Sequence, residues 1–321
     1  MPIYDKSILN QKAKELGVVR DTLEKVCRLQ EILRFFSTSE LLSSSLALKG
    51  GTAINLLLFN LPRLSVDIDL DFCRNVSRKE MFFERDKIQN LISRYMLSQG
   101  YTINPHSKNP HSLDSFVYDY INSAGVKDNI KIEINYSLRE HVLPIQQMGI
   151  SAQVLKNDFK VTTVSPIEIY ASKTVALLTR AAARDLYDIN YMIRYGLFGE
   201  EETQLYRKCV AFYLAIATVA PSERINFDAI DTITNHKIHT DLYPVIRDRD
   251  SFELSAAKES VKNYLKETLI LTENEKLFLR RFKKGIYCPE LVFDDEATRQ
   301  KLKSHPMAIW KTSRIKDTIE L

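Results

Sequence analysis

The chain has 321 residues, 45% of them hydrophobic and 27% charged, and these ordinary values exclude disordered, collagen-like and low-complexity proteins. A chain of this length can bury a core without disulfides or a structural metal. Its formal net charge of +4 permits a polyanionic partner without requiring one. Only 9 residues are Gly, which favours helix because Gly is costly inside helices, and two of them are adjacent, at Gly50-Gly51.

The sequence gives no sign of export or membrane insertion. The 4 Cys residues lie far apart without a C-x-x-C pair, which is typical of reduced thiols. The first residues, MPIYDKSILNQ, lack the apolar core of a signal peptide. The longest largely apolar run, residues 209–220, is shorter than the roughly 18 to 20 residues that span a bilayer. We therefore expect a soluble, cytoplasmic protein.

The first half of the chain mixes the helix and strand periods. Residues 5–45 are expected to be mainly helical, because apolar residues recur there at steps of three and four. Further helices are expected over 53–59 and 79–100. Residues 65–72 alternate apolar and polar side chains, which predicts a half-buried strand. Similar patterns predict strands over 101–104, 115–120 and 130–136.

The second half is expected to be almost wholly helical. The predicted helices cover residues 166–195, 200–219, 251–271 and 273–282. The strand pattern stops near residues 155–165. The sequence therefore predicts an α+β protein in which a mixed α and β domain with N-terminal helices, residues 1–160, precedes a mostly helical domain, residues 161–321.

Three carboxylates share one face of the strand expected over 65–72. Asp67, Asp69 and Asp71 alternate with apolar residues, although Asp is a poor strand former. Residues i and i+2 of a strand are about 6.6 Å apart, so their carboxylates can converge on one site. Such charges repel unless a cation lies between them, and Mg²⁺ prefers carboxylate oxygen. The alternative is a solvated strand face without a metal.

The Gly pair precedes a predicted helix start. Gly50, Gly51 and Thr52 form a turn in which backbone N–H groups can approach an anion closely. A phosphate-holding turn beside a metal-binding strand is typical of phosphoryl or nucleotidyl transfer. An ordinary tight turn is the alternative.

The run KGGTAINLLLFNLPRLSVDIDLDF resembles motif I of the AbiEii/AbiGii-type nucleotidyltransferase toxins, which are grouped with the MenT toxins. These belong to the polymerase-β-like nucleotidyltransferase superfamily, so the resemblance implies a core with a mixed sheet. It implies Asp67 and Asp69 as metal ligands for Mg²⁺ or Mn²⁺, an NTP as substrate, and a role for the Ser65 hydroxyl. Asp71, one step beyond the pair, is a weaker candidate.

The resemblance continues through residues 167–173 and 184–189, where Lys173 and Asp188 match the family's Lys and Asp. It implies that Lys173 neutralises triphosphate charge and that Asp188 orients it. On one continuous helix the 15-residue spacing would leave them about 60° apart, on one side. Asp185, about 120° from Lys173, fits less well. A Lys and an Asp on a solvated helix face are the alternative.

Other candidates are weaker. Glu133, on the polar face of the strand expected over 130–136, is equally well explained as a third metal ligand or as an exposed neighbour of Lys131. The four cations within residues 279–284 are typical of a solvated helix end, with contact to an RNA backbone as the alternative. His236 and His239 have no partners at zinc spacing. Trp310 is expected to be a packing residue.

The resemblance implies a toxin of a toxin–antitoxin or abortive-infection system, with a cognate antitoxin protein as partner. It would transfer a nucleoside monophosphate from an NTP to an RNA acceptor, notably the tRNA 3′ end. The alternatives are a nucleotidyltransferase acting on a small molecule or a protein, and a non-catalytic nucleotide-binding module.

Overall fold

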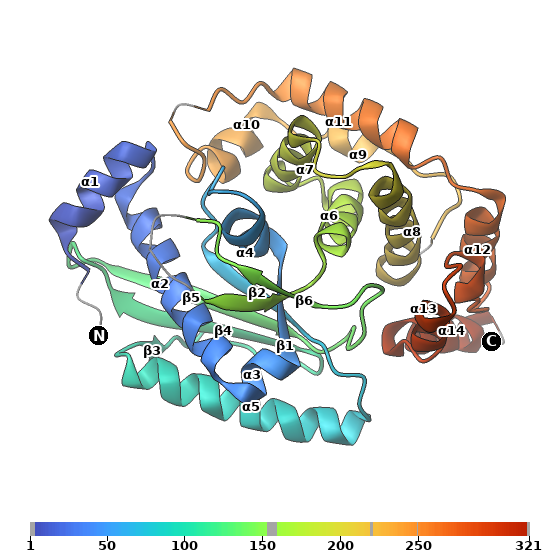
Figure 1. Cartoon of the computed structure of the whole chain (residues 1–321), viewed down its shortest axis with the longest axis horizontal. Helices are drawn as coiled ribbons and strands as arrows, with labels where there is room; N and C mark the ends of the chain where they lie inside the picture. The colour runs from blue at the N-terminus through green and yellow to red at the C-terminus, as the bar shows by residue number, and fades with distance from the viewer. Residues whose placement is uncertain (1–3, 153–158, 219–220, 249, 320–321) are drawn as a thin grey trace. The chain divides into compact units, whose positions relative to one another are not determined.

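A computed structural model describes residues 4–152, 159–218, 221–248 and 250–319 of the chain (Figure 1). The chain divides into two compact units. The first consists of residues 1–139, 145–164 and 245–250, and the second of residues 140–144, 165–244 and 251–321. Two short segments, 140–144 and 245–250, thus belong to the unit that does not contain their neighbours in sequence. No periodicity in the sequence indicates this exchange.

Across its described residues the first unit is built on a mixed sheet of seven strands, which confirms the α+β prediction. Two neighbouring pairs, β1–β7 and β2–β5, are parallel, and the other neighbours are antiparallel. The strands, in their order across the sheet, are β3 (Thr102–Ile103), β4 (Leu113–Ile121), β5 (Lys127–Asn135), β2 (Asp67–Phe72), β1 (Leu46–Lys49), β7 (Lys160–Thr163) and β6 (Gln146–Gly149).

Three of these strands were not expected from the sequence. β1, β6 and β7 have four residues each, which is too short to establish a period of two. β1 follows α3 directly and continues into α4, so its Leu-Ala-Leu run is equally compatible with helix. These strands complete one side of the sheet, because β1 pairs with β2 and with β7.

The helices of the first unit follow the expected order. They are α1 (Lys6–Leu16), α2 (Arg20–Thr38), α3 (Glu40–Ser45), α4 (Gly50–Ala53), the π-helix η1 (Ile54–Leu58) and α5 (Arg78–Ser98). α5 begins with a capping box, in which Glu80 N–H donates to Ser77 Oγ at 3.2 Å and Ser77 N–H donates to Glu80 Oε2 at 3.0 Å.

The alternation of Asp and apolar residues along β2 determines which face of the sheet the three aspartates lie on. Ile68, Leu70 and Phe72 are at most 2% exposed. Leu70 lines a small cavity together with Leu33 and Phe36 of α2, so the apolar face of β2 is covered by this helix. Since successive side chains of a strand point to opposite faces, the aspartates of β2 lie on the other face.

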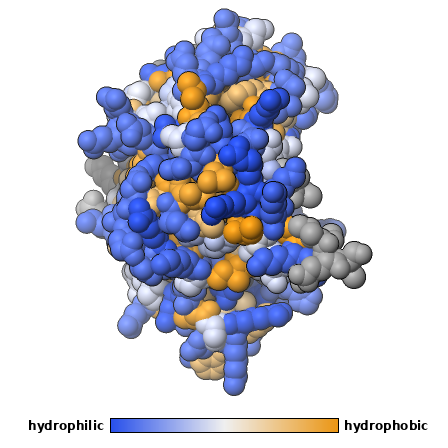
Figure 2. All heavy atoms as spheres, turned by 90° about the vertical axis from the view of Figure 1, so that its right-hand side faces the viewer, coloured by the Kyte–Doolittle hydropathy of each residue, from blue (hydrophilic) through white to orange (hydrophobic). Residues whose placement is uncertain are grey.

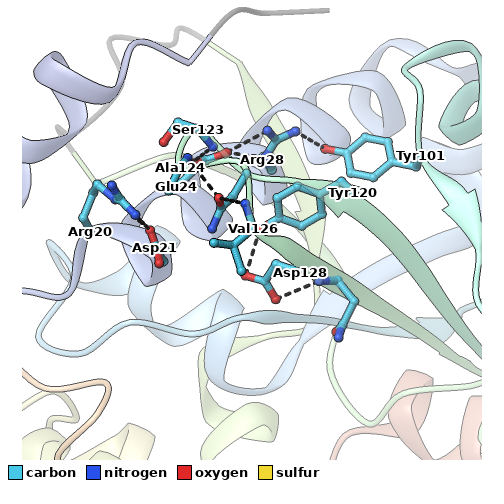
Figure 3. Close-up of polar contacts among 12 residues, drawn as sticks. Arg20, Asp21, Glu24, Arg28, Tyr101, Tyr120, Ser123, Ala124, Val126 and Asp128 are labelled. Atoms are coloured by element: carbon cyan, nitrogen blue, oxygen red, sulfur yellow. Dashed lines mark hydrogen bonds and ion pairs between the residues drawn. The ribbon is translucent and has the colours of Figure 1, made fainter.

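A buried ion pair ties α2 to the edge of the sheet (Figure 3). Glu24 is fully buried, binds Arg28 at 2.7 Å and accepts a hydrogen bond of 2.9 Å from the backbone N–H of Ser123, in the turn between β4 and β5. The Arg28 guanidinium lies 4.1 Å from the ring centroid of Tyr120 in β4 and 4.5 Å from that of Tyr4. Charge, hydrogen bonding and cation–π contacts therefore fix this helix to the sheet.

In its described residues the second unit is helical. Its helices are α6 (Pro166–Arg180), α7 (Ala183–Tyr195), α8 (Glu200–Ala217), α9 (Asp228–Asp231), α10 (Asn235–Lys237), the π-helix η2 (Ile238–Leu242), α11 (Leu254–Thr268), α12 (Glu273–Lys283), the 3₁₀-helix η3 (Pro289–Leu291), α13 (Glu296–Lys303) and α14 (Pro306–Ile319). Among the described residues, no helix has the length and apolar composition needed to cross a membrane.

A fully buried carboxylate holds segment 140–144 in the second unit. Glu168 of α6 accepts hydrogen bonds of 2.8 Å from the backbone N–H groups of Val142 and Leu143. It accepts a third, of 2.7 Å, from the Tyr213 hydroxyl of α8. Burial alone would raise the pKa of Glu168, but these bonds and the nearby His141 lower it overall. The hydrogen bonds to Glu168 therefore attach this segment to the second unit, with His141 and Val142 buried.

Candidate functional site

The Gly pair packs directly against the side chains that follow it in sequence. Gly50, the first residue of α4, has φ +69°, and a Cβ there would lie 2.7 Å from Asp69 Oδ2. A Cβ on Gly51 would lie 2.5 Å from Arg63 Nη2 and 3.0 Å from Ser65 Oγ. The distances to Asp69 Oδ2 and to Arg63 Nη2 are shorter than real Cβ contacts. Only Gly can therefore occupy either position without moving these neighbours.

Thr52 joins the turn to the start of β2. Its side chain is fully buried, and its hydroxyl lies beside the backbone carbonyl of Asp67 and 3.0 Å from Ser65 Oγ. A hydroxyl has one proton to donate, and the carbonyl of Asp67 is the closer acceptor. Ser65 precedes β2, which begins at Asp67 rather than at residue 65 as expected.

Two further polar residues of this site were missed in the sequence. Asn55, fully buried, donates from Nδ2 to the carbonyl of Gly51 at 2.7 Å and accepts the backbone N–H of Arg63 at 3.1 Å. Arg63 is 2% exposed and donates from Nη1 to the carbonyl of Leu64 at 3.0 Å. They share no spacing pattern with the aspartates. The sequence indicated these two residues only by their position between Gly51 and Asp67.

Asp67 and Asp69 face charged partners on the neighbouring strand. In the parallel register of β2 and β5, Asp67 pairs with Lys131 and Asp69 with Glu133. Lys131 Nζ lies 2.9 Å from a carboxylate oxygen of Glu133. Burial would lower the pKa of Lys131, but the hydrogen bond to Glu133 and the charges of Glu133, Asp67 and Asp69 raise it overall. The carboxylates thus form a common negative field.

Asp71 differs from the other two aspartates of β2. It is 1% exposed, and its carboxylate lies 2.5 Å from Lys49 Nζ. Asp67 and Asp69 are partly exposed. The structure thus gives Asp71 a buried ion pair and leaves Asp67 and Asp69 as the accessible carboxylates of this strand.

Of the carboxylates expected to bind a metal, Asp67 and Asp69 lie on β2 and Glu133 lies on the neighbouring strand β5. Within the described residues there is no group of three or more His, Cys, Asp or Glu arranged to hold a metal ion. Glu133 is the register partner of Asp69 on β5. Among the described residues, however, Glu133, Asp67 and Asp69 do not form a metal-binding group of three.

The second unit brings Lys173 and Asp188 together by a different route from the one expected. The helix expected over 166–195 ends at Arg180, Ala181 adopts a left-handed conformation with φ 51°, and α7 begins at Ala183. The assumption of one continuous helix is therefore wrong. Lys173 Nζ nevertheless lies 2.8 Å from Asp188 Oδ2, because α6 and α7 pack against each other.

Asp185, expected to fit less well, is an equal partner of this cluster. Its Oδ1 accepts a hydrogen bond of 2.8 Å from Lys173 Nζ, and its Oδ2 accepts one of 3.0 Å from Arg180 Nε. Lys173, Asp185 and Asp188 are at most 8% exposed. The helix break explains why rotation angles along one axis failed to identify Asp185.

The comparison with protein families gives a match over most of the chain. Residues 34–278 match the model of the AbiEii nucleotidyl transferase toxins of type IV toxin–antitoxin systems. The chain belongs to this family. It is therefore a nucleotidyltransferase of the AbiEii type, and the matched range contains the Gly pair, the aspartates of β2 and the Lys173 cluster.

Solved structures give a second comparison for this AbiEii toxin. The MenT4 nucleotidyltransferase toxin from Mycobacterium tuberculosis H37Rv matches with a TM-score of 0.64 and 14% identity over 94% of this chain and 98% of that one. The STING-associated CdnE c-di-GMP synthase from Capnocytophaga granulosa matches over 99% and 89% of the two chains, with 14% identity and a TM-score of 0.25, too low to carry an argument. At this identity the MenT4 likeness shows the fold. Curated protein sequences give no match.

Proposed function

We propose that this AbiEii toxin transfers a nucleoside monophosphate from an NTP to an RNA acceptor, with the tRNA 3′ end as the expected site. The observation that carries the proposal is the contact between the Gly50-Gly51 turn and Asp69 and Ser65. It brings a turn suited to phosphate next to a pair of carboxylates suited to a divalent cation.

Asp67 and Asp69 would hold Mg²⁺, or Mn²⁺ in its place. The donor set fits, because Mg²⁺ is commonly bound by one or two carboxylates while substrate phosphates and water supply the other oxygens. Gly50 also supports this assignment, since its missing Cβ leaves room for Asp69 Oδ2. When bound, the metal would neutralise triphosphate charge and favour ionisation of the attacking hydroxyl. Glu133 is a third candidate ligand only if it leaves Lys131.

In the proposed reaction an acceptor hydroxyl oxygen forms a bond to the α-phosphorus of the NTP. The bond from this phosphorus to the β-phosphate oxygen breaks, pyrophosphate leaves, and the hydroxyl proton is released. Backbone N–H groups of Gly50 and Gly51 would bind phosphate oxygens. Since the Thr52 hydroxyl is buried and already bonded, we assign it to fixing the turn rather than to touching phosphate. Ser65 would help to hold the turn in place.

Lys173 and Asp188 are assigned by the family resemblance to the triphosphate. The ion pair of 2.8 Å supports a positioning role for Asp188, because it fixes the ammonium group of Lys173. Asp185 would share that role. A cognate antitoxin is the expected protein partner, as in other toxin–antitoxin systems.

The test is label transfer from each of the four α-³²P NTPs to total cellular RNA. Wild-type protein with Mg²⁺ should label RNA, and Asp67→Asn and Asp69→Asn should lose at least about 100-fold in rate, because the lost metal contacts stabilise the transition state by several kcal/mol. Asp119→Asn, which changes an aspartate of β4 in the same sheet, is the matched control and should retain the rate.

The acceptor and the catalytic claim are tested separately. Label on protein or on small molecules, with none on RNA, would replace the RNA acceptor by one of the alternatives. Nucleotide binding without transfer to any acceptor would support a non-catalytic module and contradict the proposal. Chelation of divalent metal should abolish transfer.

A further inference from the structure

The C-terminal part of the second unit carries a larger net positive charge than the chain as a whole. Residues 276–316 contain eleven Lys or Arg and four Asp or Glu, a net charge of +7. The whole chain has a net charge of +4, so the remaining residues together carry −3. Figure 2 views the molecule from the side where α12, α13 and α14 lie in Figure 1, and hydrophilic side chains dominate this face.

A close helix contact brings cations from two distant segments together. Gly285, just after α12, has φ +76°, and a Cβ there would lie 2.7 Å from Lys316 Cγ and 3.0 Å from the carbonyl of Thr312 in α14. Lys283 and Lys284 immediately precede this Gly, so the end of α12 packs against the turn of α14 that carries Lys316. We call Lys283, Lys284 and Lys316 the α12–α14 basic surface.

These three lysines are exposed. Within the part of the chain that the structure describes, none of them forms an ion pair, although Arg280 of the same helix binds Glu223 at 2.7 Å. Lys311 does not belong to this surface, because its ammonium group donates to backbone carbonyls at the end of α8.

Helix stability alone does not account for this arrangement. A cation in the last turn of a helix is stabilised by the helix dipole. This effect explains why Lys283 lies in the last turn of α12 and why Lys316 lies in the last turn of α14, each considered separately. Bringing two such helix ends together adds repulsion between their like charges. An anionic ligand would remove this repulsion.

We propose that the α12–α14 basic surface binds the phosphate backbone of the acceptor RNA. Three cations on one exposed surface, with no ion pair to any described residue, match a polyphosphate in charge. Trp310 of α14 is 57% exposed, but the six residue steps from it to Lys316 turn about 600°, which leaves the two side chains about 120° apart around the helix axis, so Trp310 is not part of this surface. The inference rests on the proposed function only for the identity of the ligand as RNA.

The test measures binding without catalysis, in an Asp67→Asn background. The surface variant combines Lys283→Gln, Lys284→Gln and Lys316→Gln. The control combines Lys6→Gln, Lys14→Gln and Lys79→Gln, which are exposed lysines of α1 and α5 without ion pairs among the described residues. Both variants lose three positive charges. The probe is fluorescein-labelled tRNA, followed by anisotropy from 0.05 to 0.3 M salt, and Trp310 fluorescence gives a second readout because it is the one Trp in the chain.

In the surface variant, Kd at 0.15 M salt should rise at least about tenfold, and the slope of log K against log salt should fall by about 2 to 3. In the control, Kd should change less than about twofold, because its lysines lie outside the surface. Equal losses in both variants, or no loss in the surface variant, would overturn the inference. Binding of poly-glutamate with the same affinity as tRNA would also overturn the inference, because it would indicate that the surface binds an acidic protein.

The two proposals fail separately. Surface-dependent tRNA binding without label transfer to RNA would leave this inference standing and remove the proposed reaction. Label transfer to RNA, combined with unchanged tRNA binding in the surface variant, would support the proposed reaction and overturn the proposed role of the α12–α14 basic surface.

Discussion

At the residue scale, the two adjacent glycines meet different constraints. Gly50 adopts a positive φ and faces Asp69, whereas the side-chain position of Gly51 is filled by Arg63 and Ser65. The sequence shows that a Gly pair precedes an acidic strand, and this was enough to predict that the two belong to one site. It does not show Arg63 above Gly51, because that contact depends on how residues 55–65 fold back.

Replacing Gly51 by Ala should damage the site more than the fold. The new Cβ would meet Arg63 Nη2 at 2.5 Å and Ser65 Oγ at 3.0 Å, so both side chains must shift. We expect RNA labelling to fall at least about tenfold, with a loss in unfolding free energy of about 1 to 3 kcal/mol. Gly149→Ala is the control, since its Cβ would have no neighbour within 4 Å. If the two variants label RNA equally well, the turn is not part of the site.

His305 gives the second unit a defined response to acid. It is 1% exposed, and burial lowers its pKa to about 4, with a further lowering by His141 and partial opposition from the carbonyl of Glu140 and the charge of Glu168. Because the folded pKa lies below the unfolded value of about 6.5, the stabilisation is complete above pH 6.5 and is lost as pH falls towards 4.

We therefore expect the free energy of unfolding to fall by roughly 3 kcal/mol between pH 7 and pH 4 from this group alone. Urea unfolding at several pH values measures it, and His305→Gln should flatten that part of the profile. A variant with the same acid dependence as wild type would show that other groups control it.

At the element scale, the break between α6 and α7 is a feature that the sequence does not predict. Periodicity located the helical region, and the family pattern selected Lys173 and Asp188. The break falls in three consecutive Ala residues, a composition that favours helix, so nothing local marks the left-handed residue Ala181. The packing of the two helices brings Asp185 to Lys173, and such tertiary contacts have no signature in periodicity.

Removing the cation from this cluster should destabilise the second unit. Lys173→Met leaves Asp185 and Asp188 buried without their shared ammonium group, and breaking a buried pair in this way typically costs about 3 to 5 kcal/mol. Urea denaturation measures the loss. The triple variant Lys173→Met, Asp185→Asn, Asp188→Asn should recover part of it, because no uncompensated charge remains. Equal stability of Lys173→Met and wild type would contradict a buried ion cluster.

Short strands are a second feature of the fold that hydrophobic periodicity does not predict. Asp67–Phe72 was identified by its alternation, whereas β1, β6 and β7 were missed because four residues establish no period. The mixed sheet followed from the family resemblance rather than from the patterns themselves.

At the scale of the whole molecule, residues 245–250 belong to the first unit although helices of the second unit flank them in sequence. The backbone N–H of Leu64 donates to the carbonyl of Val245 at 2.6 Å, and Arg247 Nε donates to the carbonyl of Leu61 at 2.9 Å. This segment therefore supports the loop that leads to Ser65 and β2.

A fragment of residues 1–164 should accordingly be less stable than one in which residues 245–250 are attached through a flexible linker. The attached segment restores the hydrogen bonds to the loop, each with a net value of about 1 kcal/mol. Urea midpoints of the two fragments, with a scrambled 245–250 sequence as control, measure the difference. Equal midpoints for the native and scrambled segments would contradict this account.

The central claim is that this AbiEii toxin transfers a nucleoside monophosphate to RNA through Asp67 and Asp69. The most direct measurement compares α-³²P and γ-³²P forms of the accepted NTP, with wild type and Asp67→Asn protein. We predict label in RNA from the α-phosphate alone, labelled pyrophosphate from the γ-phosphate, and neither product with Asp67→Asn. Label in RNA from the γ-phosphate, or α-label transferred equally by both proteins, would contradict the claim.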